Sequence, residues 1–297
     1  MNFKLRSARD EDAGRILEIS SRIWEGEDYI PYVLEEWLRD KNSELCVAEL
    51  EGNVISFARY LRLVPGYIWL EGLRTHPDFQ GRGAARAITR YLIEKAVSEG
   101  ALRVGLSVYS GNTASLRLAE SMGFTRRASF VYLEGKVEDL PELEVSQEVP
   151  LSRPLEASDL EVCDFLFSSK FLLAAKGYLP LGWRFYPFFM NPEIALSRMK
   201  LALQIRDAGG ISALLLSSEY SQPYGGFSLD FLEGSQREML SLLAQGKALA
   251  KGRKTVEAFV PKSETGEAPL LSLLKQLPLK SWSNFQEDIF VYELILE

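Results

Sequence analysis

A glycine-rich turn lies between two stretches of different hydrophobic period. Gly81 and Gly83 follow the alternating stretch Tyr67–Thr75, and from Ala84 apolar residues recur at helical spacing up to Gly100. Glycine lets a backbone approach a ligand closely, and a helix start offers unpaired N–H groups with about half a positive charge. This order predicts a pyrophosphate site, although a plain strand-to-helix turn has the same pattern.

The elements that must position this turn alternate along the first half of the chain. Expected helices and strands are Arg9–Glu25 (helix), a helix after Pro31, Glu44–Leu50 and Val54–Val64 (strands joined at Glu51-Gly52-Asn53), Leu102–Tyr109 (strand), Thr113–Met122 (helix) and Phe124–Leu133 (strand). Strand Tyr67–Thr75 follows the turn signal Pro65-Gly66. The pattern predicts an α/β fold.

The second half repeats a similar order of elements. The expected elements are strands Ile211–Ser217, Phe227–Leu232, Thr255–Val260 and Ile289–Leu296, with helices Gln236–Lys251 and Ala268–Leu277. Tyr178-Leu179-Pro180 echoes Tyr29-Ile30-Pro31, and Arg153–Asp159 echoes Arg6–Asp12. These echoes favour a duplication, although α/β chains in general share such an order. We expect domains at 1–135 and 151–297, joined by an acidic linker at 136–150.

Composition narrows the class of protein. The 297 residues carry a formal net charge of −7, which is the wrong sign for a nucleic-acid partner. We expect neither a membrane helix nor a signal peptide, and therefore a cytoplasmic protein. The two cysteines, Cys46 and Cys163, are expected to be buried thiols, and the single His76 excludes a multi-histidine metal centre, so no metal cofactor is expected.

Two segments resemble the GNAT superfamily of acyl-CoA N-acyltransferases. Gln80, Gly83 and Ala85 match the family pattern Q/R-x-x-G-x-G/A, which opens the helix after a central strand. A later segment resembles the family's second motif, because Asn112 begins a helix that ends in a hydrophobic residue followed by Gly123-Phe124. The resemblance covers residues 3–135 and implies the mixed-sheet GNAT acyltransferase fold.

The resemblance implies acetyl-CoA as the cosubstrate. Its pyrophosphate would bind the backbone amides that start the helix, and its pantetheine arm would pair along the central strand. The implied cofactor-binding residues are Leu73, Arg74, Thr75, Gln80, Gly81, Arg82, Gly83, Ala84, Ala85, Asn112 and Ser115. The backbone N–H of Leu73 is the candidate donor to the oxyanion that forms when an amine attacks the thioester.

An acyl transfer to an amine needs proton transfers. An alkylammonium has a pKa of about 10.4, so a base is required, and Glu71 is the candidate because it shares a strand face with Leu73 and Thr75. His76 is the weaker alternative. Many family members use a tyrosine to protonate the departing thiolate, but Ala119 stands at that position. Tyr109 or water would take that role; otherwise the chain would be a catalytically weak CoA-binding sensor.

The acceptor is expected at an acidic, aromatic loop. Trp24, Glu27, Asp28 and Tyr29 would attract a cationic amine by Coulomb and cation–π contacts, although core packing is the more ordinary role of Trp24. Glu71-Gly72-Leu73-Arg74 and the loop also resemble the histidine N-acetyltransferase group within the superfamily. We expect a small amine or amino acid first, a peptide N-terminus second, and polyamines as a further possibility.

The second half lacks a second phosphate-binding turn. Phe227–Leu232 leads into Glu233–Glu238, where one glycine lies among carboxylates that would oppose a pyrophosphate. If it is a GNAT-like repeat, it resembles the degenerate partner of a tandem acyltransferase. The aromatic stretch Tyr178–Phe189 is expected to be a buried interdomain surface, with a pocket for an apolar acceptor as the alternative. A monomer or homodimer is expected.

Overall fold

The computed structural model describes residues 3–142, 160–218, 225–262 and 268–296. The chain separates into two compact units. The first comprises Met1–Leu106, Thr113–Thr125 and Tyr292–Glu297, and the second comprises Ser107–Asn112 and Arg126–Val291. Helices and strands occur in both units, so the predicted α/β class is confirmed.

The first unit contains a mixed sheet. Its strands are β1 (Lys4–Ser7), β2 (Ser43–Leu50), β3 (Asn53–Val64), β4 (Tyr67–Thr75), the start of β5 (Arg103–Tyr109) and the end of β15 (Ile289–Ile295). Its helices are α1 (Ala13–Ser21), α2 (Ile30–Arg39), α3 (Ala84–Ser98) and α4 (Thr113–Ser121). Strands β1 to β4 pair antiparallel in chain order, and β4 pairs parallel with β5. The helices and strands expected in this half are thereby confirmed, with ends that differ by a few residues.

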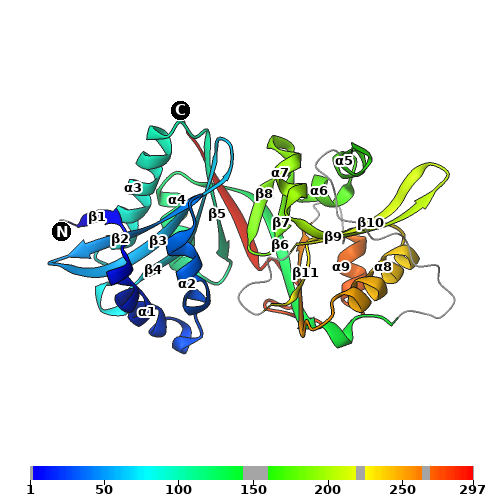
Figure 1. The fold of residues 1–297 in the computed structure, drawn as a ribbon, viewed down its shortest axis with the longest axis horizontal. Coiled ribbons are helices and arrows are strands. Elements are labelled where there is room, and N and C mark those ends of the chain that lie inside the picture. The colour runs from blue at the N-terminus through cyan, green and yellow to red at the C-terminus, as the bar shows by residue number, and fades with distance from the viewer. Residues whose placement is uncertain (1–2, 143–159, 219–224, 263–267, 297) are drawn as a thin grey trace. The chain divides into compact units, whose positions relative to one another are not determined.

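Helices cover both faces of this sheet (Figure 1). Ile16 of α1 and Val33 of α2 pack with Val47 of β2 in one hydrophobic core. Glu44 points to the opposite face of β2, because side chains alternate along a strand. On that face, Glu44 Oε2 forms an ion pair with Lys95 Nζ of α3 at 2.9 Å. Therefore α1 and α2 lie on one face and α3 lies on the other.

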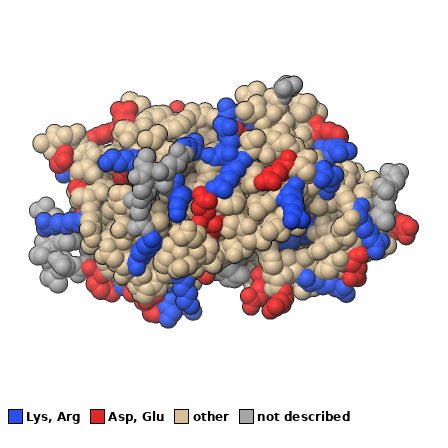
Figure 2. Space-filling model, turned by 180° about the vertical axis from the view of Figure 1, so that it is seen from behind, with Lys and Arg blue, Asp and Glu red and all other residues tan. Residues whose placement is uncertain are grey.

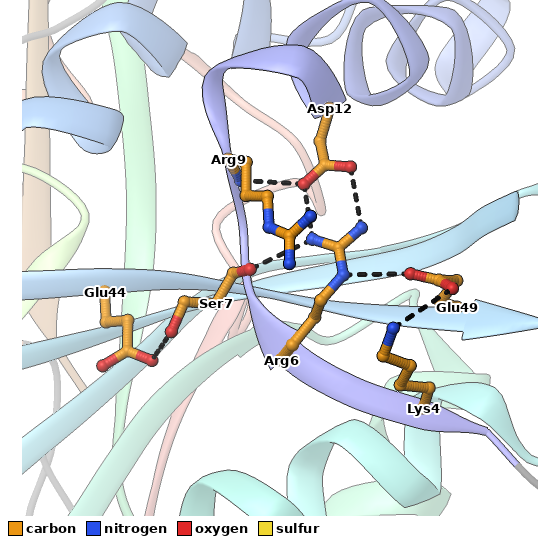
Figure 3. A network of polar contacts seen from close by, with 7 residues as sticks. All are labelled: Lys4, Arg6, Ser7, Arg9, Asp12, Glu44 and Glu49. Atoms are coloured by element: carbon orange, nitrogen blue, oxygen red, sulfur yellow. Dashed lines mark hydrogen bonds and ion pairs between the residues drawn. The ribbon is translucent and has the colours of Figure 1, made fainter. Parts of the chain in front are cut away.

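An ion-pair network fixes the edge strand β1 (Figure 3). Arg6 Nη1 and Nη2 donate to the two oxygens of Asp12 at 2.6 and 2.9 Å, and Arg6 Nε donates to Glu49 Oε2 of β2 at 2.9 Å. The hydrogen bonds from Arg6 hold the pKa of Asp12 below its usual range. Asp12 also accepts from the backbone N–H of Arg9, so the network sets the start of α1 against the sheet.

Strand β4 contains a bulge at the place where the site residues lie. Arg59 of β3 pairs with Glu71, and Phe57 pairs with Arg74, so Gly72 and Leu73 stand opposite one residue of β3. Gly72 has φ +68°, a conformation that glycine adopts without strain. The register of β4 with β5 ends at Leu70. The end of β4 therefore departs from regular sheet geometry.

The second unit contains further strands and short helices. Its strands are β6 (Thr125–Lys136), β7 (Tyr178–Leu181), β8 (Arg184–Pro187), β9 (Met199–Asp207), β10 (Gly210–Ser218), β11 (Phe227–Leu229), β12 (Phe231–Glu233), β13 (Thr255–Pro261) and β14 (Lys280–Ser281). Its helices are α5 (Leu160–Phe167), α6 (Lys170–Ala174), α7 (Pro192–Ser197), α8 (Gln236–Leu249) and α9 (Pro269–Leu274). Strand β13 pairs antiparallel with β6 and parallel with β11, while β10 pairs antiparallel with β9 and β12.

The division into units differs from the expected boundaries. Strand β6 falls in the second unit because it pairs with β13 at seven successive positions, from Thr255↔Lys136 to Pro261↔Phe130. The expected linker begins as ordered structure, since Val137–Asp139 forms a 3-10 turn, while residues 143–150 lie outside the described residues.

The sequence echoes have no common structure where they can be compared. Ile30 and Pro31 begin helix α2, whereas Leu179 and Pro180 lie in strand β7. The other echo, at 153–159, falls outside the described residues. The Tyr-x-Pro echo was therefore misleading as a sign of equivalent positions.

Charged side chains of both signs are interspersed over the face seen in Figure 2. Within the described ranges, no helix has the length and hydrophobicity needed to cross a membrane. Both cysteines are free thiols; Cys46 is buried, as expected, and Cys163 is half-buried.

Candidate active site

The glycine-rich turn has an exposed backbone with open N–H groups. Gly81 and Gly83 have φ +72° and +89°, and a Cβ built on either would meet no atom within 4 Å. Within the described part of the chain, the backbone N–H groups from Gly81 to Arg86 donate no hydrogen bond. They lie at the start of the fifteen-residue helix α3, whose macrodipole favours an anion there.

His76 lies between the end of β4 and the glycine turn. Its ring is buried, and its Nδ1 accepts a hydrogen bond from the backbone N–H of Asp78 at 3.2 Å. Burial lowers the pKa of His76, so the neutral ring with an accepting Nδ1 is favoured. Its backbone N–H donates to Ile55 O at 2.9 Å. The ring thus stabilises the turn between β4 and the glycines.

Glu71 is held by a buried arginine. Arg59, whose side chain is 1% exposed, donates from Nη1 to Glu71 Oε1 at 2.6 Å and from Nη2 to Asp40 Oδ2. The guanidinium also lies over the ring of Trp37, at 4.8 Å from its centroid. One guanidinium thus pairs with two carboxylates, Asp40 and Glu71. If Glu71 acts as a general base, the proton that it takes up must compete with the ion pair from Arg59 to the same carboxylate.

The end of β4 presents backbone and hydroxyl groups. Ser56 of β3 donates from Oγ to Arg74 O at 2.7 Å and lies 2.9 Å from Thr75 Oγ1. Leu73 falls in the bulge, where it has no partner residue in the register with β3. The bulge therefore interrupts the regular pairing of β4 with β3 at Leu73.

The expected acceptor loop is already paired with a cation of the protein, the side chain of Arg74 from β4. Arg74 donates from Nε and Nη2 to the two oxygens of Asp28 at 3.0 and 2.9 Å, and Asp28 is fully buried. Ser20 Oγ donates to Asp28 Oδ2 at 3.0 Å. The guanidinium of Arg74 lies 4.3 Å from the Trp24 ring centroid and 5.4 Å from that of Tyr29.

The contacts predicted for a substrate ammonium are thus made by Arg74. The prediction that Trp24 packs in the core was wrong, because the residue is 57% exposed. Its backbone has φ +47°. Glu27 is solvent-exposed. Of the four predicted acceptor residues, Trp24, Asp28 and Tyr29 come together around one guanidinium, and this arrangement leaves no uncompensated charge on Asp28.

The remaining predicted residues divide between the units. Ser115 lies in the first unit, whereas Tyr109 and Asn112 lie in the second. Tyr109 is 39% exposed and contacts Trp282 edge-on, with ring centroids 5.2 Å apart. Ala119 is buried in α4, so its methyl group packs in the position where the family motif has a tyrosine.

The corresponding helix start in the second unit is occupied by its own side chains. Ser235 Oγ accepts from the backbone N–H of Glu238, and Glu238 Oε2 accepts from the backbone N–H of Ser235 at 2.8 Å. A Cβ at Gly234 would lie 2.5 Å from Ala213 Cβ. This capping box uses two backbone N–H groups at the start of α8 and places a carboxylate there, in contrast to α3.

Sequence reasoning missed the arginines of both charge clusters as partners of the predicted residues. Arg59 lies in β3 among buried neighbours, and an arginine at a buried position of a strand is a signal of a buried ion pair. Arg74 was assigned to the cofactor, but its partner Asp28 is 46 residues away in sequence. Among the described residues, no group of three or more His, Cys, Asp or Glu side chains is arranged to hold a metal.

A bulged strand, an open glycine turn and a helix N-terminus follow one another between Tyr67 and Ser98. Residues 13–124 match the model of the acetyltransferase (GNAT) family. A histidine N-acetyltransferase from Oreochromis niloticus is 34% identical over 88 residues, which are 29% of this chain and 26% of that protein. The chain thus matches about a quarter of that relative's length.

Solved structures of the same fold extend over the whole chain. A GCN5-related N-acetyltransferase from Sphaerobacter thermophilus is 17% identical, with a TM-score of 0.62 over 99% of this chain and 95% of that one. A tandem GNAT protein from the clavulanic acid biosynthesis pathway is 14% identical, with a TM-score of 0.62 over 99% of this chain and 98% of that one. The expected GNAT-type α/β fold is therefore confirmed, and one of the structures that share it is a tandem GNAT protein.

Proposed function

We propose that this protein is an N-acetyltransferase that moves the acetyl group of acetyl-CoA to a primary amine by direct attack. The open N–H groups from Gly81 to Arg86 carry the proposal, since they form an anion site at the start of α3. Gln80 and the turn residues Gly81 to Ala85 would hold the pyrophosphate. Leu73, Arg74 and Thr75 would pair with the pantetheine arm, and Asn112 and Ser115 would complete the cofactor site.

The reaction would use the bulge of β4. A neutral amine attacks the thioester carbon, the carbonyl oxygen becomes an oxyanion, and the C–S bond breaks to release the CoA thiolate. The N–H of Leu73 would donate to the oxyanion. Glu71 would take the amine proton, and Tyr109 or water would protonate the thiolate. A small amine or amino acid is the proposed acceptor, and a peptide N-terminus is the second choice.

A CoA-binding sensor is the second candidate function. Two observations favour it: Ala119 is buried where the family motif has a tyrosine, and Glu71 is ion-paired with Arg59. A missing general acid costs roughly 100- to 10,000-fold in rate. Thiol release from acetyl-CoA over a panel of amines separates the two functions, because a sensor binds the cofactor but releases no thiol.

Two glutamate variants test the cofactor site with a matched control. Gly83→Glu places a side chain and a like charge on the phosphates, and we expect it to abolish acetyl-CoA binding measured by calorimetry. Gly52→Glu is the control, because Gly52 lies in the β2–β3 turn, also has positive φ and also has open space around its Cβ. The two variants carry the same charge and a similar backbone strain. Equal affinity in both would contradict the assigned site.

Thermal stability supplies an independent readout. Acetyl-CoA at about 100 times its Kd should stabilise the native protein by about 2.7 kcal/mol. We expect this shift in the native chain and in Gly52→Glu, and its absence in Gly83→Glu.

A further inference from the structure

Two glutamates face each other across neighbouring strands of the second unit. Glu134 of β6 and Glu257 of β13 are direct cross-strand partners, and like charges in such a pair are destabilising. Neither forms an ion pair with a lysine or arginine within the described ranges. Lys280 lies opposite Glu134 in β14, but its side chain is exposed to solvent.

The two carboxyl groups have fewer hydrogen-bond donors around them than they need. The Tyr132 hydroxyl lies 3.3 Å from Glu257 Oε2 and 3.4 Å from Glu134 Oε2, and it has a single hydrogen to donate. Trp282 Nε1 donates to Glu134 Oε1 at 3.2 Å. Glu257 Oε1 is shielded from water and has no hydrogen-bond partner. The pair therefore requires either a bound proton or a bound cation.

Aromatic rings surround the two carboxyl groups. Ring centroids of Tyr132 lie 5.1 Å from Trp183 and 4.6 Å from Trp282, and the two tryptophans are 5.6 Å apart. Trp282 is 44% exposed, and Trp183 and Glu134 are half-buried. The cluster thus offers solvent-accessible indole surface directly beside uncompensated carboxylates.

Carboxylates beside aromatic rings favour an organic cation as the ligand. Carboxylates repel anions, and aromatic faces attract organic cations, more strongly where water is excluded than at exposed sites. An alkylammonium brings both an apolar surface for the rings and N–H donors for the orphaned oxygen. We propose that Tyr132, Trp183, Trp282, Glu134 and Glu257 form a binding site for an organic ammonium ion. All five residues belong to the second unit, and the proposal does not depend on acetyl transfer.

Ligand binding at this site is coupled to a proton. Burial, followed by the nearby carboxylate of Asp230, raises the pKa of Glu257 to about 8, with Glu134 adding to the rise. The hydrogen bond from Tyr132 acts in the opposite direction. The empty site therefore holds a proton at neutral pH, and the ammonium displaces it. Affinity should rise with pH until Glu257 is fully ionised in the free protein.

The test measures binding to the full chain in the absence of acetyl-CoA. n-Butylammonium and its uncharged counterpart n-butanol are titrated by calorimetry and by tryptophan fluorescence, to which Trp183 and Trp282 contribute together with the three other tryptophans. We expect n-butylammonium to bind at least tenfold more tightly than n-butanol. Glu257→Gln should weaken n-butylammonium at least tenfold. Glu138→Gln is the control, because Glu138 is an exposed carboxylate of the same unit, paired with Lys136, and it should bind like the native chain.

A second variant keeps the test decisive if Glu257→Gln does not fold. Trp282→Leu removes a partly exposed ring and should also weaken n-butylammonium. Equal affinities for the amine and the alcohol, or native affinity in both variants, would overturn the proposal. The thiol-release assay with acetyl-CoA is a separate measurement, so ammonium binding without thiol release in that assay would overturn only the proposed enzyme activity. Acetyl transfer without ammonium binding would overturn only this site.

Discussion

Replacing Gly72 with alanine tests whether the bulge of β4 depends on glycine for two separate reasons. Gly72 has φ +68°, and an added Cβ would lie 2.6 Å from Cη2 and Cζ3 of Trp37. Trp37 has little room to move, because it is 3% exposed, packs edge-on against Tyr29 at 5.9 Å and lies beneath Arg59 at 4.8 Å. The substitution therefore adds a collision to backbone strain.

The two contributions have separate magnitudes. A left-handed backbone costs a residue with a Cβ about 1–2 kcal/mol, and overpacking a buried site costs about 1–3 kcal/mol. We expect Gly72→Ala to lower the free energy of unfolding by about 2–5 kcal/mol. Gly81→Ala is the matched control, since Gly81 has φ +72° and a Cβ there meets nothing within 4 Å. It should lose only about 1–2 kcal/mol.

Urea unfolding of both variants, with linear extrapolation at unchanged m, measures the difference. In a Trp37→Phe background the far edge of the indole is absent, so the cost of Gly72→Ala should fall close to that of Gly81→Ala. Equal losses for Gly72→Ala and Gly81→Ala in the native background would refute the collision with Trp37. A cost of Gly72→Ala unaffected by Trp37→Phe would refute it as well.

Three further predictions concern charges and caps. Asp28→Asn should lower the free energy of unfolding by about 3–5 kcal/mol, because it leaves the guanidinium of Arg74 buried without its counter-charge, and denaturant titration measures this loss. Glu257 has a pKa raised to about 8 in the folded chain, against the ordinary value of 4.5 for a glutamate, so the folded chain binds the extra proton. Native stability should therefore fall as pH rises from about 4.5 to 8, and Glu257→Gln should remove this slope in melting curves taken across that range. Ser235→Ala should cost about 1 kcal/mol by removing the cap of α8, and calorimetry should show unchanged acetyl-CoA affinity.

Local patterns explain which elements could be predicted from sequence. Strand β4 was expected at Tyr67–Thr75 and has those bounds, because the Pro65-Gly66 turn fixes its start. The expected strand Phe227–Leu232 is instead two strands, β11 and β12, separated at Asp230. Asp230 is buried and accepts hydrogen bonds from the backbone N–H groups of Gly182 and Ser218. Such long-range contacts leave no periodic signal in the sequence.

The candidate site divides in the same way. The glycine turn could be predicted because strand, turn and helix are consecutive, and the structure gives Gly81 and Gly83 the positive φ that the pattern requires. The charges of the site could not be predicted, because their partners are distant in sequence. Arg59 lies 12 residues before Glu71, and Arg74 lies 46 residues after Asp28. The residue types alone therefore predicted a free base at Glu71 and a free acceptor carboxylate at Asp28, whereas the structure pairs each of them with an arginine.

The two acidic and aromatic clusters of the chain differ in what balances their charge. Asp28 is neutralised by Arg74, whose guanidinium also covers the rings of Trp24 and Tyr29, so an external ammonium would have to displace a bidentate ion pair. Glu257 has no such partner within the described ranges, and one of its oxygens has no hydrogen bond at all. A free cation therefore loses less by binding at Glu257 than at Asp28. The expectation of a cation site in the loop before α2 rested on composition alone, whereas the uncompensated charge points to the second unit.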